Sequence, residues 1–211
     1  MVYKLSEIEQ AVRIAIDENA SCESLLQEED VETLSLNALI RAKAEEGARR
    51  VQQQCPLHYL EEGHDFGRSV YWEDGGCGYI LLPEDFMRLI SFKMSDWKRT
   101  LHEAIDAFHP LYARQSSACS GLRGNIYKPV CALVNRPEGK VLEFYSCESH
   151  DAFVEEGIYC PYPKFDCFDG LDLSERCYES IIYETAALVL SAYGASTQSE
   201  LLSNLSKTLL I

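Results

Sequence analysis

Cysteine and histidine are the residue types in this chain best suited to nucleophilic or metal chemistry. The nine cysteines stand at positions 22, 55, 77, 119, 131, 147, 160, 167 and 177, with no Cys-x-x-Cys pair. An odd count spread along the chain is typical of reduced thiols that serve as small apolar side chains, not of a disulfide framework. Most of them lie within apolar runs, where a thiolate lacks the cationic setting that it needs. We therefore expect these cysteines to fill the core and predict no catalytic residue.

A four-ligand zinc site could be drawn from Cys55, His58, His64 and Cys77. Structural zinc sites normally present two closely spaced pairs, whereas His64 and Cys77 are thirteen positions apart. The sequence therefore predicts no metal and no cofactor.

Two carboxylate pairs, Glu84 with Asp85 and Asp166 with Asp169, have the residue type used in acid–base catalysis. Glu84 and Asp85 follow Pro83, a position where the start of a helical turn favours negative charge, so we prefer a structural interpretation. The chain contains no Gly-x-Gly-x-x-Gly, Walker loop, Gly-x-Ser-x-Gly or His-Glu-x-x-His motif. We predict that the protein is not an enzyme.

Composition points to one globular domain with a strongly acidic surface. The 211 residues are 46% hydrophobic, and 19 basic against 34 acidic residues give a net charge of −15. Such a charge argues against a protein that grips DNA or RNA, but not against one that DNA slides past. The first residues lack a secretory signal, and the apolar runs are too short to span a bilayer, so we expect a soluble protein made in the cytosol.

Helices are predicted at the N-terminal end of the chain. Apolar side chains recur at helical spacing from Leu5 to Ile16, with a capping box at Ser6 and Glu9. A longer helix is predicted over 35–55, ended by Pro56. Its apolar stripe contains small residues around Gly47, which indicates that another helix approaches closely there.

Helical spacing returns from Ser174 to Tyr193, and Gly194 stands where a glycine would end that helix. Thr197 and Glu200 form a second capping box, which opens a final helix rich in leucine. Between these two helical regions, short apolar or alternating runs indicate strands at 79–82, 89–94, 130–134, 141–145 and 157–160. The runs 130–134 and 141–146 are the best hairpin candidate. Residues 100–108 fit a short helix or an irregular strand equally.

These elements predict an α+β fold. The N- and C-terminal amphipathic helices pack together, because each apolar stripe needs a partner, and a central antiparallel β module is inserted between them. We treat 1–211 as a single domain in which 1–60 is helical, 66–165 is the β insert and 172–211 is helical.

The segment 78–97 fits the pattern "strand, Leu-Pro-x-Asp-Phe-x-Arg-Leu, strand, Trp". In this pattern it resembles an element of the head-to-tail adaptor proteins of short-tailed bacteriophages. The family is also called ring, gatekeeper or tail tubular proteins, and related forms occur in crAss-like Bacteroides phages. The matching positions are Leu82, Pro83, Asp85, Phe86, Arg88, Leu89 and Trp97.

The same residues have a physical interpretation. Pro83 would end a strand, Glu84 and Asp85 would open one helical turn, and Phe86 and Leu89 would enter the core before the next strand leaves in a new direction. Further along, a loop with Tyr162 and Pro163 precedes a long helix rich in alanine and leucine, which is similar to the order of elements in these adaptors.

The resemblance implies a non-enzymatic structural protein of the virion, located at the head-to-tail interface and assembled in the host cytoplasm. Its copies would form a homo-oligomeric ring, a dodecamer in this family, docked to the portal protein and to a neighbouring ring or tail protein. DNA would pass through the lumen without specific binding, and no membrane is involved. Carboxylates in the lumen would repel the duplex over the Debye length, and ring closure would need two different complementary faces on each subunit.

Two alternatives remain open: a cytosolic protein-interaction module that uses its acidic surface for a basic partner, and an enzyme with a site built on Cys and His. A separate prediction concerns the apolar end of the chain. We expect Leu209, Leu210 and Ile211 to dock onto a neighbouring subunit or the portal, the alternative being that they fold back on their own helix pair.

Overall fold

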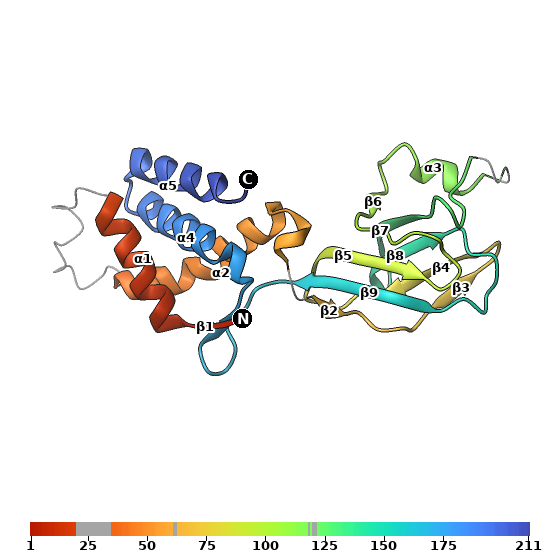
Figure 1. Cartoon of the computed structure of the whole chain (residues 1–211), viewed down its shortest axis with the longest axis horizontal. Coiled ribbons are helices and arrows are strands. Elements are labelled where there is room, and N and C mark those ends of the chain that lie inside the picture. Colours follow the sequence, from red (N-terminus) through yellow and green to blue (C-terminus); the bar gives the residue numbers. More distant parts are fainter. Residues whose placement is uncertain (20–34, 61–62, 118, 120–121) are drawn as a thin grey trace. The chain divides into compact units, whose positions relative to one another are not determined.

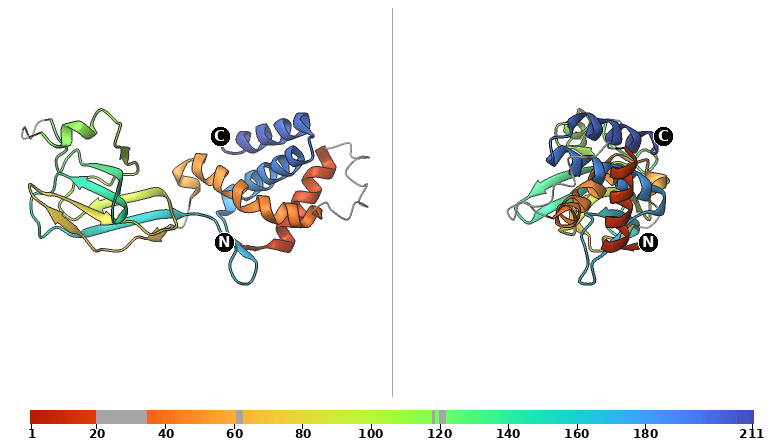
Figure 2. Two further views of the ribbon diagram at one scale, coloured as in Figure 1. Left: turned by 180° about the vertical axis from the view of Figure 1, so that it is seen from behind. Right: turned by 90° about the vertical axis from the view of Figure 1, so that its left-hand side faces the viewer.

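The computed structural model describes residues 1–19, 35–60, 63–117, 119 and 122–211. The chain divides into two compact units (Figures 1 and 2). The helical unit comprises 1–61 with 162–211, and the β unit comprises 62–161. This confirms the α+β class, with helices from both chain ends and strands from the centre. The β unit differs from the predicted insert, 66–165, by four residues at each end. That 1–211 acts as a single domain stays a prediction.

The helical unit is built around α4 (Tyr178–Ala192), which packs against α1 (Leu5–Asn19), α2 (Leu36–Gln54) and α5 (Ser196–Thr208). The sequence of α4 is apolar on almost every side, as expected for a helix surrounded by others. Figure 2 shows the four helices gathered in one bundle. The predicted packing of N-terminal helices on C-terminal helices is confirmed. The described residues of this unit also form two one-turn 3-10 helices, η1 (Leu57–Tyr59) and η2 (Glu175–Cys177).

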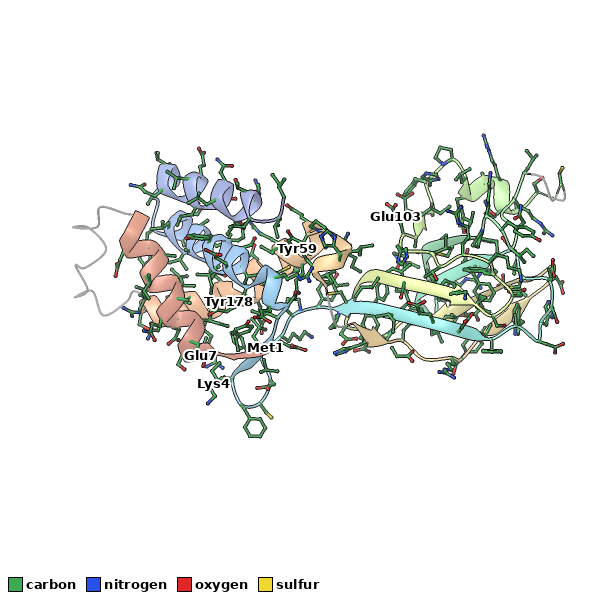
Figure 3. All side chains as sticks on the ribbon, in the orientation of Figure 1. Met1, Lys4, Glu7, Tyr59, Glu103 and Tyr178 are labelled. Atoms are coloured by element: carbon green, nitrogen blue, oxygen red, sulfur yellow. The ribbon has the colours of Figure 1, made fainter. Side chains whose placement is uncertain are left out.

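A two-stranded antiparallel sheet fixes the start of the chain. β1 (Val2–Lys4) pairs with β10 (Gly170–Asp172). Tyr3 stacks on Tyr178 at the start of α4, with ring centroids 4.1 Å apart; Tyr178 is labelled beside this strand in Figure 3. The first residues are therefore bound to a segment from the far end of the sequence.

Close approach between α2 and α4 occurs at Gly47. A Cβ atom built on Gly47 would lie 2.4 Å from Thr185 Oγ1 and 3.2 Å from the Thr185 Cα. The prediction that small residues admit another helix here is confirmed. The predicted start and end of α2 also agree with the structure: Ser35 Oγ accepts a hydrogen bond from the Ala38 N–H, and the helix ends before Pro56.

Both predicted capping boxes are wrong. Helix α1 begins at Leu5, one residue before Ser6, because the strand β1 ends at Lys4 and leads directly into the helix. Helix α5 begins at Ser196 with no side-chain cap, because the turn that ends α4 leads directly into it. That turn contains Gly194 at φ +80°, which confirms the predicted helix-ending glycine.

The described residues of the β unit form two sheets. The three-stranded sheet has the order β2 (His64–Asp65), β9 (Val154–Pro161), β5 (Phe86–Met94). The five-stranded sheet has the order β3 (Tyr71–Glu73), β4 (Cys77–Leu81), β8 (Gly139–Tyr145), β7 (Val130–Arg136), β6 (Ile105–Asp106). Only the β6–β7 pair among the strands described is parallel, and the short helix α3 (Tyr112–Gln115) follows β6. The β7–β8 hairpin confirms the prediction for 130–146.

Aromatic side chains form the core of the β unit. Phe92 contacts Trp97 and Phe144, with ring centroids 5.1 and 6.0 Å apart, and all three are buried. Leu101 forms an isolated bridge with Phe92, and β6 follows at 105–106. Residues 100–108 are thus an irregular, partly extended segment, which explains why periodicity alone did not assign them.

Candidate functional site: the corner of the β unit and its surfaces

The segment that resembles the adaptor element forms a corner between the two sheets. β4 belongs to the five-stranded sheet and β5 to the three-stranded one, so the predicted change of direction is confirmed. The predicted helical turn at Glu84 and Asp85 is wrong. These residues form a β-turn closed by the Phe86 N–H, which donates to the Pro83 carbonyl at 3.1 Å, because Phe86 already starts the next strand.

Tyr159 of β9 contacts two of the matched positions at this corner. Its ring stacks on Phe86 at a centroid distance of 5.5 Å, and its hydroxyl donates to Asp85 Oδ1 at 2.8 Å. The corner is therefore held both by an apolar contact and by a charge-assisted hydrogen bond. The other matched positions divide by burial: Leu82, Leu89 and Trp97 are buried in the same core, whereas Pro83 and Arg88 are half-buried.

The Tyr159 contact predicts a loss of stability at high pH. Burial, and then the hydrogen bond to Asp85, raise the pKa of Tyr159 to about 12. An unfolded tyrosine ionises near pH 10, so the unfolded state loses this proton first. The free energy of unfolding should therefore fall as pH rises from about 10 through about 12. Tyr159→Phe should show a shallower fall in urea unfolding across that window, and Tyr127→Phe, at an exposed position, should not. Parallel curves for wild type and Tyr159→Phe would contradict the prediction.

Most of the described thiols lie in the core. Cys55, Cys131, Cys147, Cys160 and Cys177 are buried, Cys77 is half-buried, and Cys119 and Cys167 are exposed; Cys22 lies outside the described residues. Burial raises the pKa of Cys131, and burial together with the neighbouring Asp96 raises the pKa of Cys147. Both thiols therefore stay protonated and unreactive at neutral pH.

Of the four residues considered for zinc, Cys55 is buried and its thiol donates to the Gln52 carbonyl at 3.5 Å. His58 and His64 are exposed, and Cys77 is half-buried. Over the part of the chain that the structure describes, no group of three or more His, Cys, Asp or Glu side chains has the arrangement of a metal site.

The second carboxylate pair orders a loop of the helical unit. Asp166 Oδ1 accepts the backbone N–H groups of Phe168 and Gly170, each at 2.7 Å. Asp169 forms an ion pair with Arg41 of α2. These contacts give both carboxylates a role in loop conformation.

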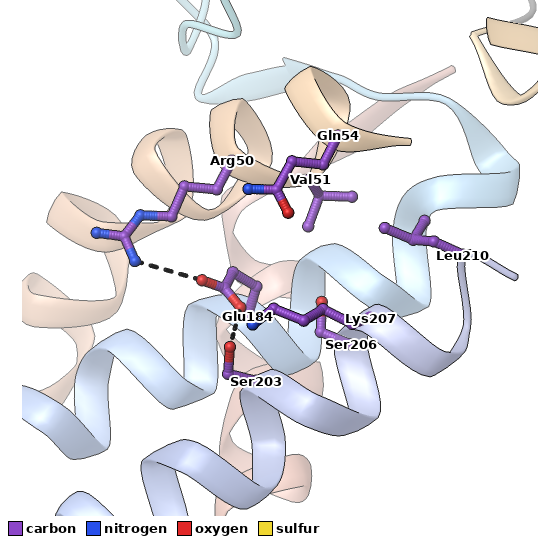
Figure 4. A pocket seen from close by; sticks show the side chains of 8 residues that line it. All are labelled: Arg50, Val51, Gln54, Glu184, Ser203, Ser206, Lys207 and Leu210. Carbon is purple, nitrogen blue, oxygen red and sulfur yellow. Dashed lines mark hydrogen bonds and ion pairs between the residues drawn. The ribbon is translucent and has the colours of Figure 1, made fainter. Parts of the chain in front are cut away.

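A pocket of about 260 Å³ lies between α2, α4 and α5 (Figure 4). Glu184 is almost buried in it, and its two carboxylate oxygens lie 3.4 Å from Arg50 Nη1 and 3.1 Å from Ser203 Oγ. The carboxylate is therefore paired within the fold.

Leu210 lines the same pocket, whereas Leu209 is partly exposed and Ile211 is fully exposed. One of the three candidate docking residues thus folds back on the helices, and two present apolar surface. Docking of 209–211 onto another protein stays a prediction.

Sequence reasoning missed a buried charge on β8. Glu143 accepts hydrogen bonds from Tyr145 at 2.5 Å and Tyr112 at 3.1 Å, and it pairs with Arg136 at 2.6 Å. The Arg136 guanidinium also lies 4.2 Å from the ring centroid of Tyr79. The available signal was a glutamate inside the apolar run 141–145 that forms a strand.

Two exposed phenylalanines were also missed. Phe108 is 96% exposed and Phe168 is 87% exposed, and each donates its backbone N–H to an aspartate two positions earlier, at 2.7 Å. The signal in the sequence is Asp-x-Phe, a local turn that holds an aromatic side chain outside the core. Exposed aromatic side chains of this kind are typical anchors of protein–protein interfaces.

His102 and His109 contact the backbone. His102 Nδ1 lies 2.9 Å from the Ile90 carbonyl, and His109 Nδ1 accepts the Leu111 N–H at 3.1 Å. Both side chains are exposed.

No helix within the described ranges is long and apolar enough to cross a membrane. No protein-family model matches the sequence, and comparison with curated proteins gave no match. A functional assignment therefore depends on the corner at 82–89, on the order of the elements and on the exposed surfaces described above.

Proposed function

We propose that this protein is a structural subunit of a phage head-to-tail connector. Copies form an oligomeric ring that docks to the portal protein and to the next tail component, and DNA passes through its lumen. The observation that carries the proposal is the corner at 82–89. It leads from one sheet to the other in a β unit inserted between N- and C-terminal helices, which is the order of elements that the resemblance implies.

Charge and surface chemistry support a ring that conducts DNA without binding it. A net charge of −15 gives the phosphate backbone few cationic partners. Phe168 and Ile211 expose large apolar side chains, which suit contacts with other proteins. The buried, protonated thiols of Cys131 and Cys147 favour a structural role over nucleophilic chemistry.

The test is assembly with the portal protein encoded in the same genome. The chain is purified, mixed with that portal and measured by mass photometry, and the products are imaged by electron microscopy. We expect annular complexes with many copies of the chain on one face of the portal. A chain that neither binds the portal nor occurs in purified virus particles would contradict the proposal. Monomers that bind a basic protein instead would support the interaction-module alternative.

Removal of 209–211 tests the end of the chain in the same assay. Because Ile211 and Leu209 expose apolar surface, the truncated chain should bind portal about tenfold more weakly. Leu201→Ser, at another exposed leucine of α5, serves as the control and should bind as the wild type does. Equal affinity of the truncated and full chains would mean that these residues are not a docking element.

A further inference from the structure

The loop 165–170 presents an aromatic side chain from a rigid base. Besides the two bonds to Asp166 described above, two residues of α2 hold the loop: Arg41 pairs with Asp169, and Glu45 Oε1 accepts the Phe165 N–H at 3.0 Å. A preorganised loop loses little conformational entropy when it binds a partner. Phe168 is therefore an aromatic anchor with carboxylates on both sides of it in the sequence.

A groove of about 350 Å³ lies on the β unit. It is lined by residues 99–103 with Lys128 and Pro129; Glu103 is labelled in Figure 3. The buried Pro129 and the half-buried Leu101 supply apolar surface. Arg99 and Lys128 are exposed, and among the described residues neither has an ion-pair partner. Two cations, Arg99 and Lys128, against one carboxylate, Glu103, give the groove a net positive charge in a protein whose net charge is −15, and this suits an acidic, aromatic ligand.

We propose that Phe168 of one copy of the chain inserts into this groove on a neighbouring copy. The ring would bury its apolar surface against Leu101 and Pro129. The exposed Asp166 would bring negative charge to Arg99 and Lys128, since Asp169 is already paired with Arg41. A cation beside the face of the inserted ring adds a favourable cation–π contact. The proposal rests on the proposed function, because it names the contact that joins subunits within the ring.

The geometry of ring closure requires this kind of contact. The loop belongs to the helical unit and the groove to the β unit, so the two partners are different surfaces of the same chain. Heterologous contacts repeated around an axis close a cyclic ring, whereas identical surfaces in contact give only a twofold dimer.

Cross-linking in the assembled complex identifies what Phe168 contacts. Phe168 is replaced by the photo-reactive analogue p-benzoylphenylalanine, and subunits with natural nitrogen are mixed with heavy-nitrogen subunits before assembly on the portal. We expect cross-links to peptides that contain 99–103 or 128–129. Cross-linked pairs that join a natural-nitrogen peptide to a heavy-nitrogen peptide show that the contact is between two copies of the chain. Cross-links to the portal alone, within one chain alone, or to other peptides of the chain would overturn the inference.

A matched pair of variants measures how much the contact contributes. Phe108 stands in the same Asp-x-Phe turn as Phe168 and is equally exposed, but it belongs to the β unit. Phe168→Asp should raise the subunit concentration needed for ring formation by about tenfold or more, and Phe108→Asp should leave it unchanged. Arg99→Glu combined with Lys128→Glu should act like Phe168→Asp.

The results of these experiments distinguish a failure of the Phe168 contact from a failure of the proposed connector function. If wild-type rings form and Phe168→Asp assembles as well as Phe108→Asp does, the inserted-aromatic contact is wrong and the connector function stands. If the wild type forms no ring with the portal, both are wrong.

Discussion

Glu143→Ala should lower the free energy of unfolding of the β unit by about 3–5 kcal/mol, because it removes one member of a buried ion pair and the acceptor of two tyrosine hydroxyls. The Glu143 side chain is 8% exposed and the Arg136 side chain is 23% exposed, so solvent replaces little of the lost interaction. Arg136 keeps its contact with Glu73 at 2.6 Å, but Tyr112 and Tyr145 lose the carboxylate that both hydroxyls reach.

Tryptophan fluorescence measures the loss of stability in the β unit specifically. Both tryptophans of the chain, Trp72 and Trp97, lie in the β unit, so their emission during urea unfolding reports on that unit. Glu138→Ala, at an exposed position in the adjoining hairpin loop, is the matched control and should change stability by less than about 0.5 kcal/mol. Equal stability of the two variants would show that the buried network contributes nothing net.

Gly47→Val should lower the free energy of unfolding of the helical unit by about 3 kcal/mol. The first added carbon would already lie 2.4 Å from Thr185 Oγ1, and the Thr185 backbone N and Cα lie only 3.2 Å away. A side-chain oxygen can rotate, but the backbone of α4 cannot move without disturbing its packing on α1 and α5. The clash therefore outweighs the gain of less than about 1 kcal/mol in helix propensity.

Far-UV circular dichroism during urea unfolding follows the helices and so detects this change. Ala42→Val introduces the same side chain at an exposed position of α2, where it meets none of the other described helices. This control therefore shows the effect of valine on helix propensity without the clash. Combined with Gly47→Val, Thr185→Ala removes the nearest atom and should restore part of the lost stability, but not all of it, because the backbone contacts remain. Full stability of Gly47→Val would mean that the two helices do not approach each other as described.

Both predictions concern residues whose effect depends on a neighbour that is distant in the sequence. Gly47 meets Thr185 from another helix, and Glu143 meets Tyr112 from α3. A small residue in an apolar stripe did indicate a close helix contact, but not which helix makes it. The glutamate within 141–145 gave no indication of its partners, because a strand pattern indicates only which side chains share a face of the sheet and not what lies opposite them.

The amino-acid sequence by itself determined the elements that depend on local patterns. Helical periodicity, the Ser35 cap and Pro56 define α2; Gly194 ends α4; and two apolar runs around a short turn define the β7–β8 hairpin. Each of these signals acts within a few residues of the chain, so periodicity and turn chemistry are sufficient to detect it.

Only the tertiary structure shows where contacts between distant segments override the conformation that the local sequence favours. β1 pairs with β10 and so sets the start of α1 ahead of its capping box. β5 pairs with β9 from Phe86 onward and so replaces an expected helical turn at Glu84 and Asp85 with a β-turn. Asp85 likewise meets Tyr159, which is 74 positions away. Strand pairing and side-chain burial join segments that local periodicity treats as independent, and their combined free energy exceeds the roughly 1 kcal/mol of a cap.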